Sequence, residues 1–219
     1  MYKKIAFILF LFCPFLLIGQ KNSYSTWIGV QYPVSISTKW QWHNDAGFRT
    51  ISISGHPSQM LYRTGVRRLV NNHFSYALGG ALFFTRTTNF KENDEFGTEQ
   101  RIWEEALLQK KINNKLQWTN RFRLEQRWFM QTDDKNAFFA SRFRIKTLLS
   151  KEITEKLSIQ LADEYMAQYD LGKLKFNQNR VQLLTNISLN KKFSLQVGYM
   201  FMSLPSTNQH CGVLIFQKS

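Results

Sequence analysis

Cysteine and long apolar runs are both scarce in this sequence. It holds two cysteines among 219 residues, Cys13 and Cys211, and because Cys13 falls in a segment that we expect to be cleaved, the mature chain has no disulfide partner for Cys211. After residue 20 no apolar run approaches the roughly 20 residues that a membrane-spanning helix needs. The mean hydropathy of −0.34 is low as well. A disulfide-stapled fold and a helical membrane protein are therefore both excluded.

Motifs for catalysis, metal binding and phosphate binding are missing too. The four histidines, His43, His56, His73 and His210, are scattered, and the acidic segment 91–97 lacks the ordered oxygen ligands of a calcium loop. No glycine-rich phosphate loop occurs. We therefore predict no catalytic residue, no metal ligand and no cofactor. An outer-membrane hydrolase is kept as a second alternative, because catalytic triads are recognised by geometry, which a sequence does not give.

The first nineteen residues have the form of a secretory signal peptide. Lys3 and Lys4 precede the apolar run 5–18, and Gly19 places a small residue before the expected cleavage site. The run of roughly 14 residues is short for a membrane-spanning helix. A lipoprotein signal is excluded because Phe12, which is not a small residue, precedes Cys13. We predict a signal peptide at residues 1–19 and one domain over 20–219.

The charge balance is strongly positive. Lysine and arginine number 29 against 15 aspartates and glutamates, a formal net charge of +14. In a cytosolic protein this balance would suggest nucleic acid, but a secreted chain does not meet the genome, so no nucleic-acid partner is expected. The positive side chains are instead expected in a barrel interior, against anionic lipid head groups, or facing an acidic partner.

The most informative segment runs from Leu116 to Trp128 and alternates with a period of two. Every second residue from Leu116 gives Leu, Trp, Asn, Phe, Leu, Gln and Trp, whereas those between are Gln, Thr, Arg, Arg, Glu and Arg. Successive side chains of a β-strand point to opposite faces, so the segment is predicted to be a strand with an apolar and a charged face. At helical spacing the two sets would mix.

Similar alternation recurs along the chain, between short polar turns and longer acidic, glycine-bearing or proline-bearing connections. Outer-membrane barrels show this pattern, with lipid outside, a polar interior, short periplasmic turns, long outer loops and aromatic girdles; aromatic residues make up 15% of this chain. We therefore predict an all-β, transmembrane, antiparallel up-and-down β-barrel of 10 to 12 strands, monomeric by default. Its predicted strands are 24–33, 37–53, 58–70, 73–87, 99–110, 115–128, 138–150, 156–167, 176–188, 193–202 and 208–216.

These eleven segments conflict with the even number expected when a chain begins and ends on the periplasmic side. Either Tyr24–Pro33 is not a barrel strand, which leaves ten, or Thr38–Ile53 contains a second crossing, which gives twelve. The sequence leaves both alternatives open.

A further set of features consists of Trp27, Glu99–Trp103, Arg121–Arg127, Phe176–Arg180, Tyr199–Met200 and the segment around His210. With these features the chain resembles the DUF2490 family of Gram-negative outer-membrane proteins, over essentially its whole mature length. The family often has an amide after the tryptophan of the fifth strand, where this chain has Glu104. The resemblance implies a β-barrel in the outer membrane and supplies no reaction.

The charged faces of the predicted strands would line the lumen. Long side chains largely fill the interior of a narrow barrel, so we predict a packed network in which arginine forks bridge glutamates. The first alternative is a small anion-selective pore, because basic side chains outnumber acidic ones. Outer-membrane lipid is the expected partner, with anionic solutes or lipopolysaccharide as candidate ligands. The predicted lumen residues are Arg63, Arg67, Glu99, Arg101, Glu105, Arg121, Arg123, Glu125, Arg127, Arg142, Arg144, Glu164, Gln178 and Arg180.

Overall fold

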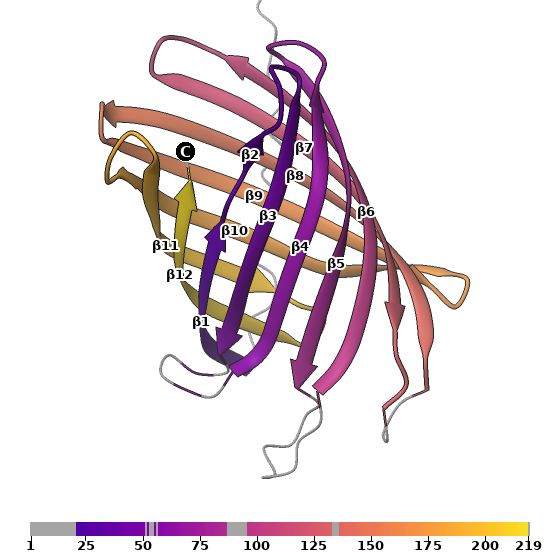
Figure 1. Cartoon of the computed structure of the whole chain (residues 1–219). Helices are drawn as coiled ribbons and strands as arrows, with labels where there is room; N and C mark the ends of the chain where they lie inside the picture. The colour runs from indigo at the N-terminus through magenta and orange to yellow at the C-terminus, as the bar shows by residue number, and fades with distance from the viewer. Residues whose placement is uncertain are drawn as a thin grey trace, which may run out of the picture.

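A computed structural model describes residues 21–50, 52, 55, 57–86, 96–132 and 136–218. The predicted signal peptide and His56 lie outside these residues, as does most of the acidic segment 91–97. The described residues form a single sheet that curls into a closed barrel, with strands running up and down around its wall (Figure 1). None of them forms a helix, and accordingly none forms a helix that is long and apolar enough to cross a membrane.

Twelve strands make up the sheet in these residues, and neighbours in sequence pair antiparallel from β2 to β12. They are β1 (Lys21–Gln31), β2 (Val34–Ser35), β3 (Trp40–Thr50), β4 (Pro57–Leu69), β5 (Phe74–Arg86), β6 (Phe96–Lys111), β7 (Leu116–Phe129), β8 (Phe138–Thr154), β9 (Leu157–Asp170), β10 (Lys173–Ser188), β11 (Phe193–Ser203) and β12 (Thr207–Lys218).

The barrel closes through β1, which pairs antiparallel with β3 and parallel with β12. The parallel register runs without a break from Lys21 opposite Thr207 to Gln31 opposite Gln217. β2 is a two-residue continuation of β1 beyond Tyr32 and Pro33, where proline has no N–H for the ladder. The wall thus has eleven strands with β2 as an additional short one.

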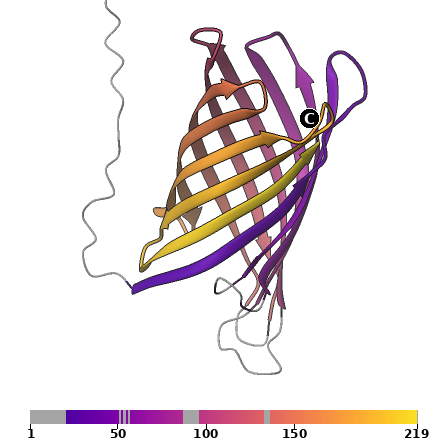
Figure 2. The same cartoon turned by 90° about the vertical axis from the view of Figure 1, so that its left-hand side faces the viewer.

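The argument that the strand number must be even was therefore wrong. It assumed that both ends of the barrel chain lie on one side, whereas an odd number is possible when one neighbouring pair is parallel. As a result β1 begins at one end of the barrel and β12 finishes at the other (Figure 2). We call the end where β1 and β12 begin the loop mouth, and the end where β12 finishes the turn mouth.

The turn mouth is built from short connections that share one hydrogen-bond pattern. Asn71, Asn113 and Asn190 each accept, at the side-chain Oδ1, hydrogen bonds from the backbone N–H groups two and three residues later. Ser37 Oγ accepts from the corresponding backbone groups of its own turn. A short polar side chain that holds its own backbone in this way favours a tight turn, which is why these segments were recognisable in the sequence.

At the loop mouth the connection between β9 and β10 is shorter than we predicted. The sequence indicated a long loop over 168–175, but the strands extend to Asp170 and from Lys173, leaving only Leu171 and Gly172 between them. Both have positive φ, 47° for Leu171 and 75° for Gly172, as a two-residue hairpin turn requires. The glycine fits this geometry without strain, and the leucine does not.

Replacing Leu171 with asparagine should therefore stabilise the barrel. Asparagine tolerates the left-handed conformation better than leucine and is favoured in such turns, and Leu171 is 90% exposed, so little packing is lost. We expect Leu171→Asn to raise the free energy of unfolding by about 0.5–1 kcal/mol, measured by urea titration of the refolded protein. An unchanged or lower value would contradict the account of this turn.

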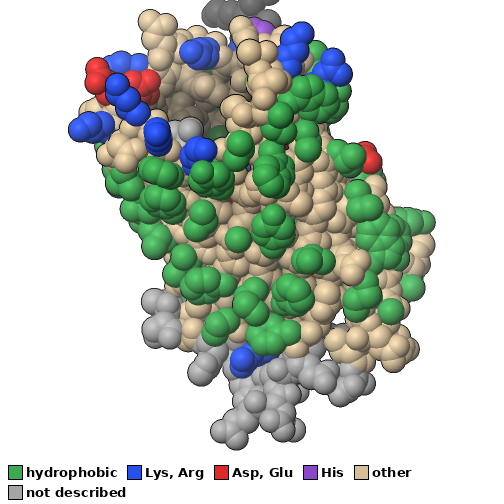
Figure 3. Space-filling view, in the orientation of Figure 1, with side chains coloured by type: hydrophobic (Ala, Val, Ile, Leu, Met, Phe, Trp, Pro, Cys, Tyr) green, Lys and Arg blue, Asp and Glu red, His purple; other side chains and the backbone are tan. Residues whose placement is uncertain are grey.

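The outer surface of the wall is largely apolar between two sets of aromatic side chains. Figure 3 shows hydrophobic side chains spread over the visible wall, with lysine and arginine gathered above them at the turn mouth. One set of exposed aromatic residues lies near the loop mouth and consists of Tyr24, Phe84, Trp128, Phe139, Tyr169 and Phe176. The other set lies near the turn mouth and consists of Tyr32, Trp40, Tyr76 and Phe216. Between them lies the outer belt, defined by Val66, Leu78, Leu82, Ile102, Phe122, Phe143, Ile145, Leu161, Leu183, Val197 and Leu214.

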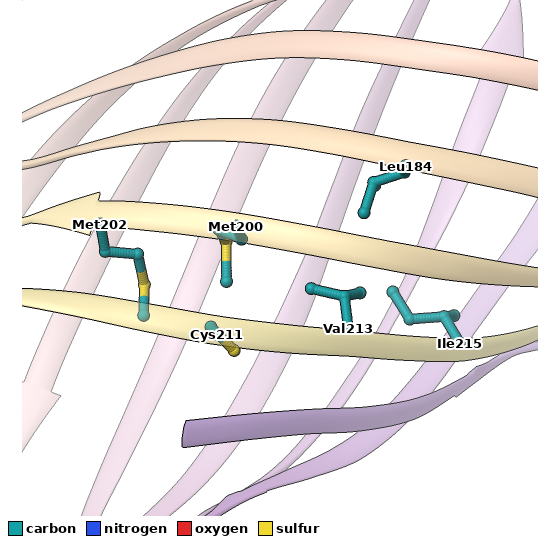
Figure 4. Packing of buried hydrophobic residues seen from close by; sticks show 6 residues of the cluster. All are labelled: Leu184, Met200, Met202, Cys211, Val213 and Ile215. Atoms are coloured by element: carbon teal, nitrogen blue, oxygen red, sulfur yellow. The ribbon is translucent and has the colours of Figure 1, made fainter. Parts of the chain in front are cut away.

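The inside of the barrel is partly apolar, which the sequence did not indicate. One buried cluster on β10, β11 and β12 contains Leu184, Met200, Met202, Cys211, Val213 and Ile215 (Figure 4). A second, on β4, β5 and β6, contains Leu61, Ala77, Ala81, Phe83 and Trp103. Trp27 of β1 packs against both. The expectation that tryptophan and phenylalanine face outward is therefore wrong for Trp103 and Phe83.

Trp103 fits inside because two glycines lie under its ring. Gly65 and Gly79 are directly opposite each other on β4 and β5, and a Cβ atom at either position would overlap the Trp103 ring and a backbone carbonyl. The indole Nε1 donates to the carbonyl of Gly80 at 3.2 Å. The absence of side chains at these glycines thus makes room for the indole ring against the sheet.

Replacing Gly79 with alanine should destabilise the barrel because the Trp103 ring has to move. Overpacking of this kind costs about 1–3 kcal/mol, and the loss should appear in the urea midpoint. Gly80→Ala is the matched control, since a Cβ atom there meets its nearest neighbour at an ordinary 3.6 Å. Equal effects of the two substitutions would refute the steric explanation.

Candidate functional site

The fourteen residues singled out from the sequence lie on six strands whose charged faces meet inside the barrel. Arg63 and Arg67 come from β4, Glu99, Arg101 and Glu105 from β6, and Arg121 to Arg127 from β7. Arg142 and Arg144 lie on β8, Glu164 on β9, and Gln178 with Arg180 on β10. The antiparallel register places Glu105 opposite Arg123, and Arg123 opposite Arg144. The register therefore places charged side chains of neighbouring strands side by side inside the barrel.

Glu125 lies at the centre of this arrangement. Its side chain is almost fully enclosed, at 1% exposure. One oxygen, Oε2, accepts hydrogen bonds from Nη2 and Nε of Arg142 at 2.5 and 2.9 Å, and the other, Oε1, accepts from Arg144 Nη1 at 2.5 Å. Arg101 Nη1 approaches Oε2 at 3.5 Å. Charge-assisted bonds of this length are strong.

Glu164 and Glu105 form the next two centres of the network. Glu164 Oε1 accepts from Arg144 Nη2 at 2.7 Å and from Arg121 Nη2 at 2.6 Å. Glu105 binds Arg67 at 2.6 Å through Oε1 and Arg123 at 2.5 Å through Oε2. Arg144 is shared between Glu125 and Glu164, so the ion pairs are continuous across β7, β8 and β9.

The fourth centre is Glu99, nearer the loop mouth. It binds Arg101 and Arg127, each with an Nε to Oε1 distance of 2.5 Å. The guanidinium planes also lie on aromatic rings: Arg101 lies 3.5 Å from the centroid of Phe83, and Arg123 lies 4.7 Å from that of Trp103. We call the ion-paired layer formed around Glu99, Glu105, Glu125 and Glu164 the central belt.

Further lumen residues contact the fourteen predicted ones or lie beside them. Asp45 binds Arg63 at 2.8 Å, and Nε2 of His43 accepts a hydrogen bond from Arg67 Nε at 3.0 Å. Lys146 donates to Gln182 at 2.7 Å. Arg49 was missed, although His43, Asp45 and Gly47 form an alternating series on β3. Extending that series by one step would have included Arg49.

Two hollows lie at the two ends of the lumen, on either side of the central belt. At the turn mouth a cavity of about 330 Å³ is lined by turn residues such as Asn113, Lys115 and Glu155. At the loop mouth a cavity of about 230 Å³, which we call the loop-mouth cavity, is lined by seven arginines and no carboxylate among the described residues. Arg49 and Arg180 are two of them, and the others are the ion-paired Arg63, Arg101, Arg127, Arg142 and Arg144.

The histidines do not form a recognisable hydrolase site in the part of the chain that the structure describes. His43 and Asp45 share a face but bind different arginines. His73 Nδ1 donates to the carbonyl of Gln109 at 3.2 Å, and His210 contacts the hydroxyl of Tyr199 at 2.6 Å. No three His, Cys, Asp or Glu side chains among these residues are grouped as a metal ion would require.

Comparison with known proteins relates this chain to a protein family. Residues 24–210 match the family model described as "Protein of unknown function (DUF2490)". No curated protein matches the chain. The match covers every strand of the barrel at least in part.

Proposed function

The chain belongs to the DUF2490 family, and from this premise we propose that it is a monomeric outer-membrane β-barrel whose lumen is closed by the central belt. The family description assigns no activity, so the proposal rests on the physical character of the two faces of the wall. One observation carries it: a closed barrel presents an apolar outer belt and encloses its charged side chains.

The dimensions of the wall suit a bilayer. A membrane-crossing β-strand needs about 9–11 residues, and apart from β2 the strands are 11 to 17 residues long. A closed wall has no free sheet edge, so its backbone groups are paired, as hydrocarbon requires. Aromatic residues on both sides of an apolar belt are typical of outer-membrane barrels. In water the same belt would be a large exposed apolar surface, which soluble monomers avoid.

The orientation follows from the connections. Outer-membrane barrels place short turns in the periplasm and longer loops outside, so the turn mouth should face the periplasm. The signal peptide predicted at residues 1–19 would deliver the chain to that compartment.

Cysteine labelling tests the location and the orientation together. We expect Leu174→Cys, at the loop mouth, to react with a membrane-impermeant maleimide on intact cells, and Lys191→Cys, at the turn mouth, to react only after permeabilisation. Because the native Cys211 is buried, we expect it to contribute little maleimide labelling of its own. Recovery of the protein in the soluble fraction, or labelling of both variants only after lysis, would overturn the proposal.

An anion-selective pore is the second candidate, favoured by the seven arginines of the loop-mouth cavity. Rings of basic side chains select anions in phosphate pores. Planar-bilayer recording distinguishes the two candidates. A closed central belt predicts no stepwise conductance, whereas anion-selective steps that weaken in Arg49→Gln would favour the pore.

A further inference from the structure

The loop-mouth cavity carries more positive charge than its described neighbours neutralise. Five of its seven arginines are held by carboxylates: Asp45 holds Arg63, Glu99 holds Arg101 and Arg127, and Glu125 holds Arg142 and Arg144. Arg144 and Arg180 also contact Glu164, which in addition binds Arg121. Seven guanidinium groups are thus matched by four described carboxylates, those of Asp45, Glu99, Glu125 and Glu164. Among the residues that the structure describes, at least three positive charges are therefore left over at this end of the lumen.

Arg49 and Arg180 carry most of this surplus. No described carboxylate lies within 4.0 Å of Arg49, and its Nε is buried without a hydrogen-bond partner. Arg180 reaches Glu164 only at 3.9 Å and otherwise donates to Gln178 Oε1 at 3.3 Å. A buried donor left unpaired is costly, and more so when it is charged. Both groups would gain from an anionic acceptor.

Trp27 brings these two arginines together beside an apolar surface. The guanidinium carbon of Arg49 lies 4.0 Å from the centroid of a Trp27 ring, and that of Arg180 lies 5.6 Å from one. Trp27 also packs against the cluster that contains Met202 and against the cluster that contains Phe83. Leu61, Phe83, Met202 and Leu204 line the same cavity. The pocket therefore offers cations on one part of its wall and apolar side chains on another.

We propose that the loop-mouth cavity binds a small organic phosphate, with its phosphate group held by Arg49 and Arg180 and its apolar part against Trp27 and its neighbours. A phosphate monoester carries nearly two negative charges at neutral pH, which matches a surplus of this size better than a single carboxylate. The planar guanidinium fork suits phosphate oxygens. A volume of about 230 Å³ exceeds the roughly 30 Å³ that one water occupies, so an organic group fits beside the phosphate.

The site goes beyond the proposed function and does not depend on it. It requires the closed barrel and the side chains at the loop mouth, and it stands whether or not the lumen conducts ions. In the proposed orientation the ligand would enter from outside the cell.

Calorimetric titration of the purified, folded barrel with phenyl phosphate tests the site. We expect one molecule to bind per barrel, and Arg49→Gln and Arg180→Gln each to weaken binding tenfold or more, as expected for the loss of a charge-assisted bond. Arg68→Gln is the matched control, because it removes the same charge from β4 at the turn mouth, where Arg68 lies 5.4 Å from the Trp40 ring. Its binding should equal that of the wild type.

Folding and ligand source are checked in the same series. Arg49 has no described counter-ion to lose, so ligand-free Arg49→Gln should be as resistant to urea as the wild type. If Arg180→Gln fails to fold, the affinity of Arg49→Gln for phenyl phosphate alone tests the site. Absence of binding to the wild type at millimolar phenyl phosphate, or equal binding by Arg49→Gln, would overturn the site. If benzoate bound more tightly than phenyl phosphate, the proposal that the site recognises a phosphate group would be wrong. If dihexanoyl phosphatidic acid bound and phenyl phosphate did not, the proposal that the ligand is a small soluble phosphate would be wrong.

Discussion

Glu125→Gln should lower the free energy of unfolding of the barrel by about 3–5 kcal/mol, the range observed when one partner of a buried ion pair is removed. The glutamine has nearly the same shape, so packing is retained and the loss is electrostatic. Arg142 would lose its only described carboxylate, and Arg144 one of its two. Urea titration, or the temperature at which the folded band disappears from an unboiled gel, measures the loss.

Two comparisons show whether the loss is electrostatic. Adding Arg142→Gln should recover part of the stability, because the uncompensated charge leaves with its partner. Glu104→Gln removes the same charge from the outer surface, where no described cation lies within ion-pair distance of Glu104, and should not lower the free energy of unfolding.

Arg123→Leu should lower the free energy of unfolding less than Glu125→Gln does, since Glu105 keeps Arg67 at 2.6 Å. A Glu125→Gln barrel as stable as the wild type would mean that the central belt does not hold the wall together.

The strands and their two faces could be predicted from the sequence because a period of two is a local property. Arg121, Arg123, Glu125 and Arg127 alternate with Phe122, Leu124 and Trp128 within one strand, and no knowledge of neighbours is needed to assign them to one face. The turns at Asn71, Asn113 and Asn190 are equally local, since each asparagine binds its own backbone. All eleven predicted segments correspond to strands of the wall.

The closure of the barrel could not be predicted, because it depends on a contact between residues that are far apart in the sequence. Ser25 faces Cys211 across the parallel pair of β1 and β12, and nothing within β1 indicates that partner. The even strand number followed from a general property of bacterial barrels, not from a property of this chain. The hairpin at Leu171 was missed for a local reason, since leucine is rarely found at positive φ.

The partners of the inward arginines were also beyond the sequence. Alternation gives the face on which Arg144 lies, but Glu164 reaches it from the neighbouring strand, and the register between β8 and β9 decides the pairing. Arg49 and Trp27 illustrate the same limit, because their contact joins β1 to β3 across an antiparallel pair. The surplus of positive charge at the loop mouth becomes visible only when the described carboxylates have been assigned to their arginines.

Ile145→Arg should lower the free energy of unfolding by about 2–4 kcal/mol in lipid bilayers, the cost of a lipid-facing arginine near the bilayer midplane. Ile145 lies near the middle of β8, is 48% exposed and has Phe122 and Tyr165 opposite it on the neighbouring strands. In water a half-exposed isoleucine would tolerate arginine, since surface substitutions usually change stability by less than about 0.5 kcal/mol. The size of the loss therefore reports which solvent surrounds the wall.

Leu174→Arg is the control for depth. Leu174 is 67% exposed on β10, one residue after the start of the strand at the loop mouth, where an arginine costs about 0–1 kcal/mol because it can reach the interface. A large loss at Ile145 with a small one at Leu174 places hydrocarbon around the outer belt. Small losses at both positions would instead mean that water or another protein covers it, and the apolar wall would then have to be explained by a partner rather than by lipid.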